Sequence, residues 1–379
     1  MGYHGRFESQ KPKKKKRGGR ILLIVLLVLV ILGAAAAIVS VTYYNKMMNK
    51  MNIIELPEDT YVYTEETEAP AEAVEATVQE EAAEVTEETT VETTVPPMTA
   101  DDIINILVVG QASRAGEESH MADTTILVTV NTYTGTVKLS SVLRDAYVKL
   151  PDYRGHTCGR AKFTVCYNLG YQWGNGTAGA MEMTNICMRD NFGVEIDYNV
   201  EVDFDGFIKI LDFMGGVEIE LTEAEAKYLN DEDLYVLYDV QPGKQWLDGM
   251  ASLAYVRMRK AEGDNESDIK RSERQRLFIS ALIDKVRHMN ISDLQSLADY
   301  LLPMISTTMT PGDIAELLMR VLPLVKDLKI EGGTIPVEGT GWGEVIDIYD
   351  DGIPDSVIKF ETAQQKRLIR AFTEAEIIE

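Results

Sequence analysis

Cysteine and histidine are scarce in this chain of 379 residues, which contains three Cys and four His. No C-x-x-C pair is present, so neither a zinc site nor a thioredoxin-like centre is predicted, and three cysteines exclude a disulfide-dense scaffold. The histidines have no metal-ligand spacing, and we interpret His120, His156 and His288 as surface residues. The absence of G-x-S-x-G, H-E-x-x-H and P-loop motifs excludes three common catalytic or nucleotide-binding signatures.

Positive charge is absent from residues 51–100, which carry 14 Asp or Glu and no Lys or Arg. Residues 1–20 have the opposite balance, with eight Lys or Arg against one Glu. The chain as a whole has a formal net charge of −24, and most of the excess lies in residues 101–379. A globular part this acidic repels phosphate backbones, so we expect no nucleic-acid partner.

Residues 21–41 form an uncharged run of 21 residues, which predicts a helix about 30 Å long, enough to cross one bilayer core. Seven positive charges in residues 11–20 precede it. Because positive flanks stay inside, we predict a cytoplasmic tail over residues 1–20, a single transmembrane helix over 21–42 and an outward-facing C-terminal part. The alternative is a cleaved signal peptide, which the alanine run at residues 34–37 would suit.

The next segment, residues 43–100, has few large apolar side chains and one sign of charge. Such a composition buries too little surface to offset the entropy of ordering, so we predict an extended extracellular stalk. Residues 101–379 then form one globular domain, since no linker-like stretch interrupts them.

Short apolar runs rich in β-branched residues alternate with amphipathic stretches in this domain. Strands are predicted at residues 105–109, 124–130, 136–142, 198–204, 217–221 and 253–258. Helices are predicted at residues 178–191, 205–214, 269–288, 292–302 and 311–322, and a final strand and helix close the chain. Strands and helices intermix, so the class is α/β or α+β with one main sheet.

Arginine is the residue type that suggests chemistry. Arg144 follows a predicted strand end, and Arg257 and Arg259 stand two apart on a predicted strand, which would place them on one face. Arg271, Arg274 and Gln275 lie on one side of a predicted helix start. Because guanidinium groups bind phosphate oxygens bidentately, this cluster suits a polyanion. The alternative is a set of surface ion pairs with Glu262, Asp264 and Glu266.

Several phrases resemble the extracellular domain of the LytR-CpsA-Psr family of cell-wall proteins. They include NILVVG at 105–110, ADTTILVTVN at 122–131, SSVLRDAYVKLP at 140–151, AKFTVCYNLGY at 161–171, GFIKILDFMGGVEIE at 206–220, AYVRMRK at 254–260 and SDIKRSERQR at 267–276. They follow the family's order and span most of the globular region. The single anchor and long stalk also fit the family's layout.

This resemblance implies an α/β/α domain with a central mixed sheet and an apolar groove for a polyprenyl chain. It implies a membrane-anchored phosphotransferase that moves a polyprenyl-pyrophosphate-linked glycan, of teichoic acid or capsular polysaccharide type, onto peptidoglycan with the help of Mg²⁺. The expected location is the outer face of the cell membrane of a Gram-positive-type bacterium.

The same resemblance assigns roles to individual residues. The residues that match pyrophosphate-binding positions are Arg144, Lys162, Arg257, Arg259, Arg271 and Gln275. Asp123 matches a carboxylate that binds the metal or acts as base, the alternative being a strand-capping residue. Asp268 matches an acidic partner that orients the arginines, so Arg144, Asp123 and Asp268 are the expected catalytic group.

Three positions depart from the family's pattern. Ala112 stands where an Asp is usual, Met121 where an Arg is usual, and Thr164 where an Asn is usual. The first change removes one candidate Mg²⁺ ligand, for which Glu117 and Glu118 are nearby alternatives. Ala112 and Met121 favour a second hypothesis, in which the domain binds polyprenyl pyrophosphate without turnover, as a sensor or carrier chaperone. A membrane-bound transcription regulator is a third, which the predicted location and the net charge disfavour.

The sequence leaves open whether two of the cysteines are bridged. Cys158 and Cys166 stand eight apart on the predicted outer side of the membrane, where a disulfide can form. Cys187 falls in the apolar pattern of a helix, so we expect it to be a small buried residue.

Overall fold

The computed structural model describes residues 46, 49–56, 98–111, 120–231, 238–258, 268–324 and 327–373. The predicted tail, the predicted transmembrane helix and most of the predicted stalk lie outside these residues. Within the part of the chain that is described, no helix is both long and apolar enough to cross a membrane.

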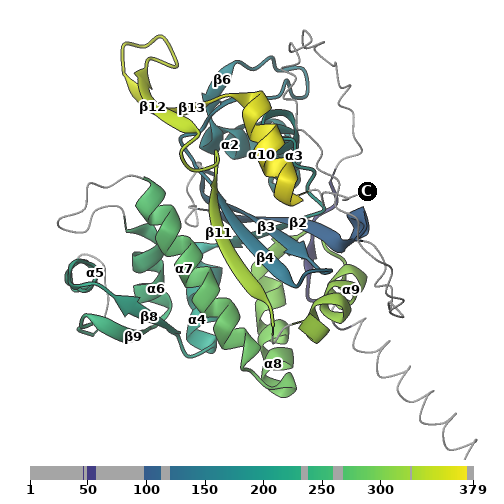
Figure 1. Ribbon diagram of the computed structural model, residues 1–379, viewed down its shortest axis with the longest axis vertical. Coiled ribbons are helices and arrows are strands. Elements are labelled where there is room, and N and C mark those ends of the chain that lie inside the picture. The colour runs from purple at the N-terminus through teal and green to yellow at the C-terminus, as the bar shows by residue number, and fades with distance from the viewer. Residues whose placement is uncertain are drawn as a thin grey trace, which may run out of the picture. The chain divides into compact units, whose positions relative to one another are not determined.

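A seven-stranded sheet forms the centre of the domain, in the order β1-β10-β7-β2-β3-β4-β11. Figure 1 labels β2, β3, β4 and β11 of this sheet. The strands are β1 (Asn52–Ile53), β2 (Ile103–Gln111), β3 (Ala122–Asn131), β4 (Thr136–Val142), β7 (Tyr198–Asp203), β10 (Ile305–Thr307) and β11 (Lys329–Ile335). β2 is antiparallel to β3 and parallel to β7. The sheet is therefore mixed, as the resemblance implied.

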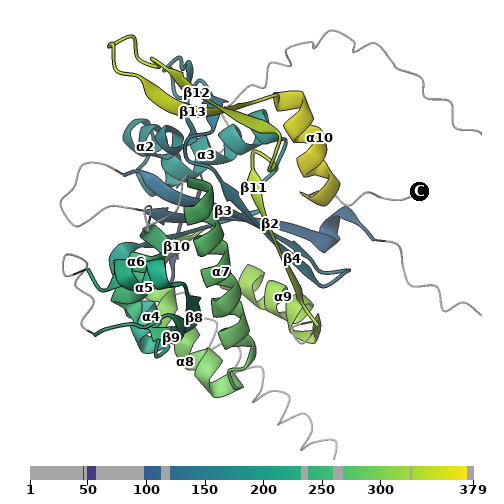
Figure 2. The ribbon, with the colours of Figure 1, turned by 60° about the vertical axis from the view of Figure 1, so that its left-hand side comes forward.

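Helices cover both faces of this sheet. One face packs against α2 (Phe163–Trp173), α3 (Thr177–Phe192) and α10 (Thr362–Thr373) through Leu107, Val109 and Leu127. The other face packs through Ile106, Ile126 and Leu139 against α7 (Asp268–Arg287) and α9 (Pro311–Val321). Figure 2 shows the two helical layers on opposite sides of the sheet. The predicted α/β/α arrangement is confirmed.

Smaller elements extend these layers. They are β5 (Tyr147–Lys149), β6 (Arg160–Lys162), α4 (Phe204–Phe213), β8 (Val217–Leu221), α5 (Glu223–Leu229), β9 (Gly243–Leu247), α6 (Gly249–Arg257), α8 (Ile291–Leu301), β12 (Gly341–Ile346) and β13 (Asp355–Phe360). β8 and β9 pair beside α6, and β12 and β13 form a separate hairpin. The chain thus closes with three strands before its last helix, where one was predicted.

Local sequence explains most of the predicted elements. The helix α3 ends at Gly193, whose φ of 71° is the left-handed conformation that glycine adopts at helix ends. Asp203 caps the start of α4, because its side chain accepts a hydrogen bond from the Gly206 backbone amide. Both boundaries agree with the sequence pattern within two residues.

The prediction of a strand at residues 253–258 is wrong, because residues 253–257 lie in the helix α6 and Met258 follows its end. The Asp248 side chain accepts a hydrogen bond from the Ala251 amide and caps the helix start. Ala251, Ala254 and Tyr255 then bury one side of the helix against Val217 and Phe278. A mostly apolar run of six residues is too short for its periodicity to distinguish a helix from a strand. The packing of the segment therefore determines which of the two forms.

One strand of the sheet comes from the segment predicted as stalk. Asn52 and Ile53 form β1, which is parallel to β10 and pairs Asn52 with Ser306. The Asn52 Nδ2 donates to Ser306 Oγ at 2.6 Å. These two residues therefore form the outermost strand on one side of the sheet.

Candidate functional site

Several predicted site residues lie together at the edge of the sheet where the central strands β2 and β7 end and β3 begins. β2 and β7 are parallel and end there, and β3 begins there because it is antiparallel to β2. Gln111 at the end of β2 pairs with Ala122 at the start of β3. Asp123 follows in β3, so its backbone stands at this edge, and its side chain lies outside the described part of the structure.

The start of α2 is tied to this edge by Thr164. Its hydroxyl donates to the Ala122 carbonyl oxygen at 2.9 Å, and its backbone amide donates to the Arg144 carbonyl at 3.1 Å. Thr164 thus joins the loop after β4 to the start of β3. The residue that departs from the family's usual Asn serves here as a buried connector between two site segments.

Lys162 precedes α2 and lies between two carboxylates. Its Nζ is 2.9 Å from Asp355 Oδ1 and 3.5 Å from Asp145 Oδ1. Burial alone would lower the pKa of Lys162, but the hydrogen bond to Asp355 and the charge of Asp145 outweigh it, so the pKa is raised. Arg144 Nε also approaches Asp145 Oδ1, at 3.8 Å. Lys162 and Arg144 are therefore neighbouring cations that share an acidic partner.

The first turns of α7 reach the same edge. Gln275 Nε2 donates to Thr124 Oγ1 on β3 at 2.8 Å and to the Val256 carbonyl oxygen at 3.2 Å. Arg271 lies one turn earlier on the same side of the helix and is only 5% exposed. The structure thus brings Gln275 to the strand that carries Asp123. Asp268 begins α7, and its side chain lies outside the described part of the structure.

Arg257 is not on a strand, so the predicted geometry of Arg257 and Arg259 on one strand face is wrong. Arg257 is the last residue of α6, and its guanidinium carbon lies 4.5 Å from the centre of the Phe204 ring. Arg259 lies outside the described residues. The role of both residues in binding pyrophosphate stays a prediction from the resemblance.

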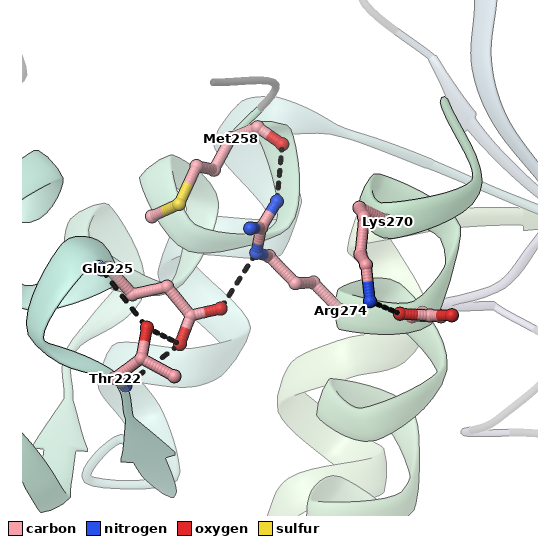
Figure 3. A network of polar contacts seen from close by, with 6 residues as sticks. Thr222, Glu225, Met258, Lys270 and Arg274 are labelled. Atoms are coloured by element: carbon pink, nitrogen blue, oxygen red, sulfur yellow. Dashed lines mark hydrogen bonds and ion pairs between the residues drawn. The ribbon is translucent and has the colours of Figure 1, made fainter. Parts of the chain in front are cut away.

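Arg274 has a different role from the one its helix position suggested. Its Nε donates to Glu225 Oε1 at 2.8 Å and its Nη1 to the Met258 carbonyl oxygen at 3.3 Å. Figure 3 shows Arg274 reaching from α7 to the start of α5, away from Lys270. Burial tends to raise the pKa of Glu225, but bonds from Thr222 and Arg274 lower it overall. We therefore assign Arg274 to a buried structural ion pair.

Two residues of this edge escaped the sequence analysis. His120 was interpreted as a surface residue, yet it is half-buried just before β3 and stacks on Tyr171 with ring centroids 3.6 Å apart. Gln111 is 6% exposed and bonds to the His120 ring. No spacing signal marks either residue, because their proximity depends on the pairing of β2 with β3.

The donor set for Mg²⁺ is incomplete among the described side chains. No group of three or more His, Cys, Asp or Glu suited to a metal ion occurs among them. Ala112, Glu117, Glu118 and the Asp123 side chain, on which the metal prediction rests, lie outside the described part. The described residues alone do not fit a metal site, and the Mg²⁺ requirement stays a prediction.

The disulfide between Cys158 and Cys166, which the sequence left open, is absent, because both residues are free thiols. Cys166 faces α3, with its Sγ 3.4 Å from the Met183 carbonyl oxygen. Burial raises the pKa of the Cys166 thiol. Cys187 is fully buried in the core, as predicted.

With this arrangement established, comparison with known proteins decides the family. A family model described as LytR_cpsA_psr family matches residues 70–365, more than half of the chain. The chain belongs to the LytR-CpsA-Psr family. The resemblance of the sequence phrases is thereby confirmed.

Curated relatives of this LytR-CpsA-Psr chain include TagT and TagU of Bacillus subtilis (strain 168). Each is named a polyisoprenyl-teichoic acid–peptidoglycan teichoic acid transferase and is 32% identical, over 193 and 198 residues respectively. These matches cover 50% and 52% of this chain, and 54% and 56% of the relatives. The chain therefore spans about half of the length of the curated relatives it matches.

Solved structures of the family share the fold. TagT bound to LIIa-WTA is 24% identical with a TM-score of 0.55, and the match covers 76% of this chain and 94% of that chain. TagT with bound octaprenyl pyrophosphate lipid is 22% identical with a TM-score of 0.51, covering 75% and 94% respectively. At these identities the likeness shows the fold alone.

Proposed function

We propose that this protein is a phosphotransferase that moves a glycopolymer from a polyprenyl-pyrophosphate carrier onto peptidoglycan. Family membership and the names of the relatives support this function. A solved family member that holds octaprenyl pyrophosphate supports the carrier class.

The observation that carries the proposal is that Thr164, which follows the neighbouring cation Lys162 and bonds to the Arg144 backbone, meets the start of β3, where Gln275 also bonds. These residues come from three distant parts of the chain and are joined through Thr164 and Thr124. The two cations can bind the oxygens of a pyrophosphate, while Gln275, whose amide already bonds to Thr124 and Val256, holds α7 against β3. Lys162 would then exchange an ion pair with Asp145 or Asp355 for one with the substrate.

The chemistry that follows is displacement at phosphorus. A hydroxyl of peptidoglycan attacks the sugar-linked phosphorus, a new P–O bond forms, and the bond to the second phosphate breaks. The polyprenyl monophosphate leaves with the electron pair, and the hydroxyl proton passes to a base, for which Asp123 is our candidate. The protein's task is to position the two substrates and to neutralise charge on the phosphate oxygens.

Membrane anchoring, outward orientation and the apolar groove for the prenyl chain are parts of this proposal. The uncharged run at residues 21–41 and the basic residues before it support the anchor and its orientation. Mg²⁺ would supply charge neutralisation at the pyrophosphate when bound. We assign no step to it from the described residues.

A transfer assay tests the function directly. The purified full-length protein would be incubated with a polyprenyl-pyrophosphate-linked glycan and peptidoglycan fragments, with and without Mg²⁺. We expect glycan attached to peptidoglycan and release of polyprenyl monophosphate, and more product with the metal present. Lys162→Met should reduce transfer at least roughly ten-fold, since one charge-assisted contact is lost.

The result also separates the two hypotheses for this domain. Tight binding of the carrier without any transfer would contradict the enzyme and favour the binding module, which Ala112 and Met121 suggest. Absence of carrier binding would contradict both.

A further inference from the structure

His120 is held in one orientation at the sheet edge by three contacts. Its ring stacks on Tyr171 of α2 at 3.6 Å between centroids, with an interplanar angle of 17°. Its backbone amide donates to Asn168 Oδ1 at 3.2 Å. The third contact joins its Nδ1 to Nε2 of the buried Gln111 side chain. A half-buried histidine restrained on its ring face, its ring edge and its backbone is pre-organised.

The contact with Gln111 determines which ring nitrogen can act on a ligand. The amide nitrogen of Gln111 carries hydrogens and can only donate, so His120 Nδ1 accepts. An imidazole whose Nδ1 accepts carries its proton on Nε2. The second ring nitrogen is therefore an N–H donor, on the ring edge that Gln111 does not occupy.

The position of this donor follows from the strand register. His120 stands two residues before Ala122, which pairs with Gln111 and accepts the hydroxyl bond of Thr164. Two residues further along β3, Thr124 accepts the bond from Gln275. The backbone of His120 thus lies beside the strand start to which Thr164 and Gln275 bond.

We infer that His120 is a further binding residue of this site and that its Nε2–H donates to a phosphate oxygen of the polyprenyl pyrophosphate. The inference deepens the proposed function and rests on it. A phosphate oxygen is the favoured acceptor because the cations of the edge already select for negative charge. The attraction between the cations and a phosphate depends little on orientation, whereas the oriented N–H of His120 would favour one position of the phosphate oxygen.

The test is the substitution His120→Phe in the full-length protein in detergent. Phenylalanine keeps an aromatic ring on Tyr171 but removes both nitrogens. The matched control is His156→Phe, because His156 stacks on Trp173 of the same helix at 4.2 Å between centroids. Binding of octaprenyl pyrophosphate would be measured by calorimetry at fixed salt, with octaprenol as the probe that has no phosphate.

We expect His120→Phe to weaken octaprenyl pyrophosphate binding about ten-fold, the usual effect of one hydrogen bond to a charged group. His156→Phe should bind like the parent, and octaprenol binding should be unchanged in both variants. His120→Gln, whose amide nitrogen can occupy the position of Nε2, should retain most of the affinity.

Three results would overturn the inference. They are unchanged pyrophosphate affinity in His120→Phe, an equal loss for octaprenol, and an equal loss in His156→Phe. A parent protein that does not bind octaprenyl pyrophosphate would instead contradict the proposed function, so the two failures are distinguishable. Thermal unfolding of each variant checks that its fold is retained.

Discussion

Lys162 illustrates how single residues of the site depend on partners that are distant in sequence. Asp145 lies on the loop between β4 and β5, but Asp355 comes from the hairpin β12–β13 near the end of the chain. Both carboxylates hold the lysine in its charged form. The site is therefore charged and pre-organised before any substrate is present.

Arg257 provides a test of the pyrophosphate pocket at the residue scale. We expect Arg257→Ala to weaken octaprenyl pyrophosphate binding roughly ten- to a hundred-fold, because one charge-assisted contact of about 1.5–3 kcal/mol is lost. Arg320→Ala is the control, since Arg320 is on α9 and pairs with Glu316. Calorimetry at fixed salt measures both variants. Equal affinity in Arg257→Ala and the parent would return Arg257 to a structural role beside Phe204.

Glu201 predicts a pH dependence of stability. It is 8% exposed on β7, and burial, together with the charge of Asp203, raises its pKa to about 7 from the ordinary value of 4.5. Between these two values the folded protein holds a proton that the unfolded chain releases. Stability therefore falls as the pH rises through this window, by up to about 3 kcal/mol above pH 7.

Glu201→Gln should remove that dependence. We expect the variant to gain stability over the parent at pH 8 and to gain little at pH 4.5, because an amide cannot ionise. Urea unfolding of both proteins at the two pH values measures the difference. A variant that loses equal stability at both values would show that Glu201 is needed for packing and that its ionisation is unimportant.

At the scale of elements, α2 and α3 approach each other closely through glycine. A Cβ added at Gly179 would lie 2.5 Å from the Gly174 Cα and 2.6 Å from the Gly170 carbonyl oxygen. Both neighbours are backbone atoms, which cannot rotate out of the way. This pair of helices lies over the sheet, and α2 carries Thr164 and Tyr171, so their spacing positions the site.

Gly179→Ala should therefore destabilise the protein by about 1–3 kcal/mol, the usual cost of overpacking. Gly343→Ala is the matched control, since a Cβ there meets nothing within 4 Å. Chemical denaturation of both variants measures the effect. Similar stability in the two variants would contradict the close packing of α2 on α3.

At the scale of the whole molecule, the N-terminal pattern predicts that residues 42–379 lie on the outer, extracellular side of the membrane. Protease added to intact protoplasts should cleave within residues 57–97, because the predicted orientation places this acidic segment on the outer side. The control is the same digestion after the membrane is opened. Protection of this segment until opening would contradict the orientation.

The sequence by itself determined the elements with a clear period. The strands β2, β3 and β4 and the helices α3, α4 and α7 follow from apolar spacing, and glycine or capping residues mark several of their ends. Sequence phrases also identified the family and the set of candidate residues. Local periodicity reports which side of an element is buried, and this information is contained in adjacent residues.

Only the tertiary structure decided which candidates meet. Gln275 and Thr124 are 151 residues apart in sequence yet share a hydrogen bond. Arg274 of the same helix forms an ion pair with Glu225 and does not join the site. The helix α6 replaced a predicted strand because its short apolar run packs on Val217 and Phe278. His120 acquired a fixed donor only through Gln111, Asn168 and Tyr171. Such long-range contacts depend on how whole elements pack, which the local pattern of any one segment does not encode.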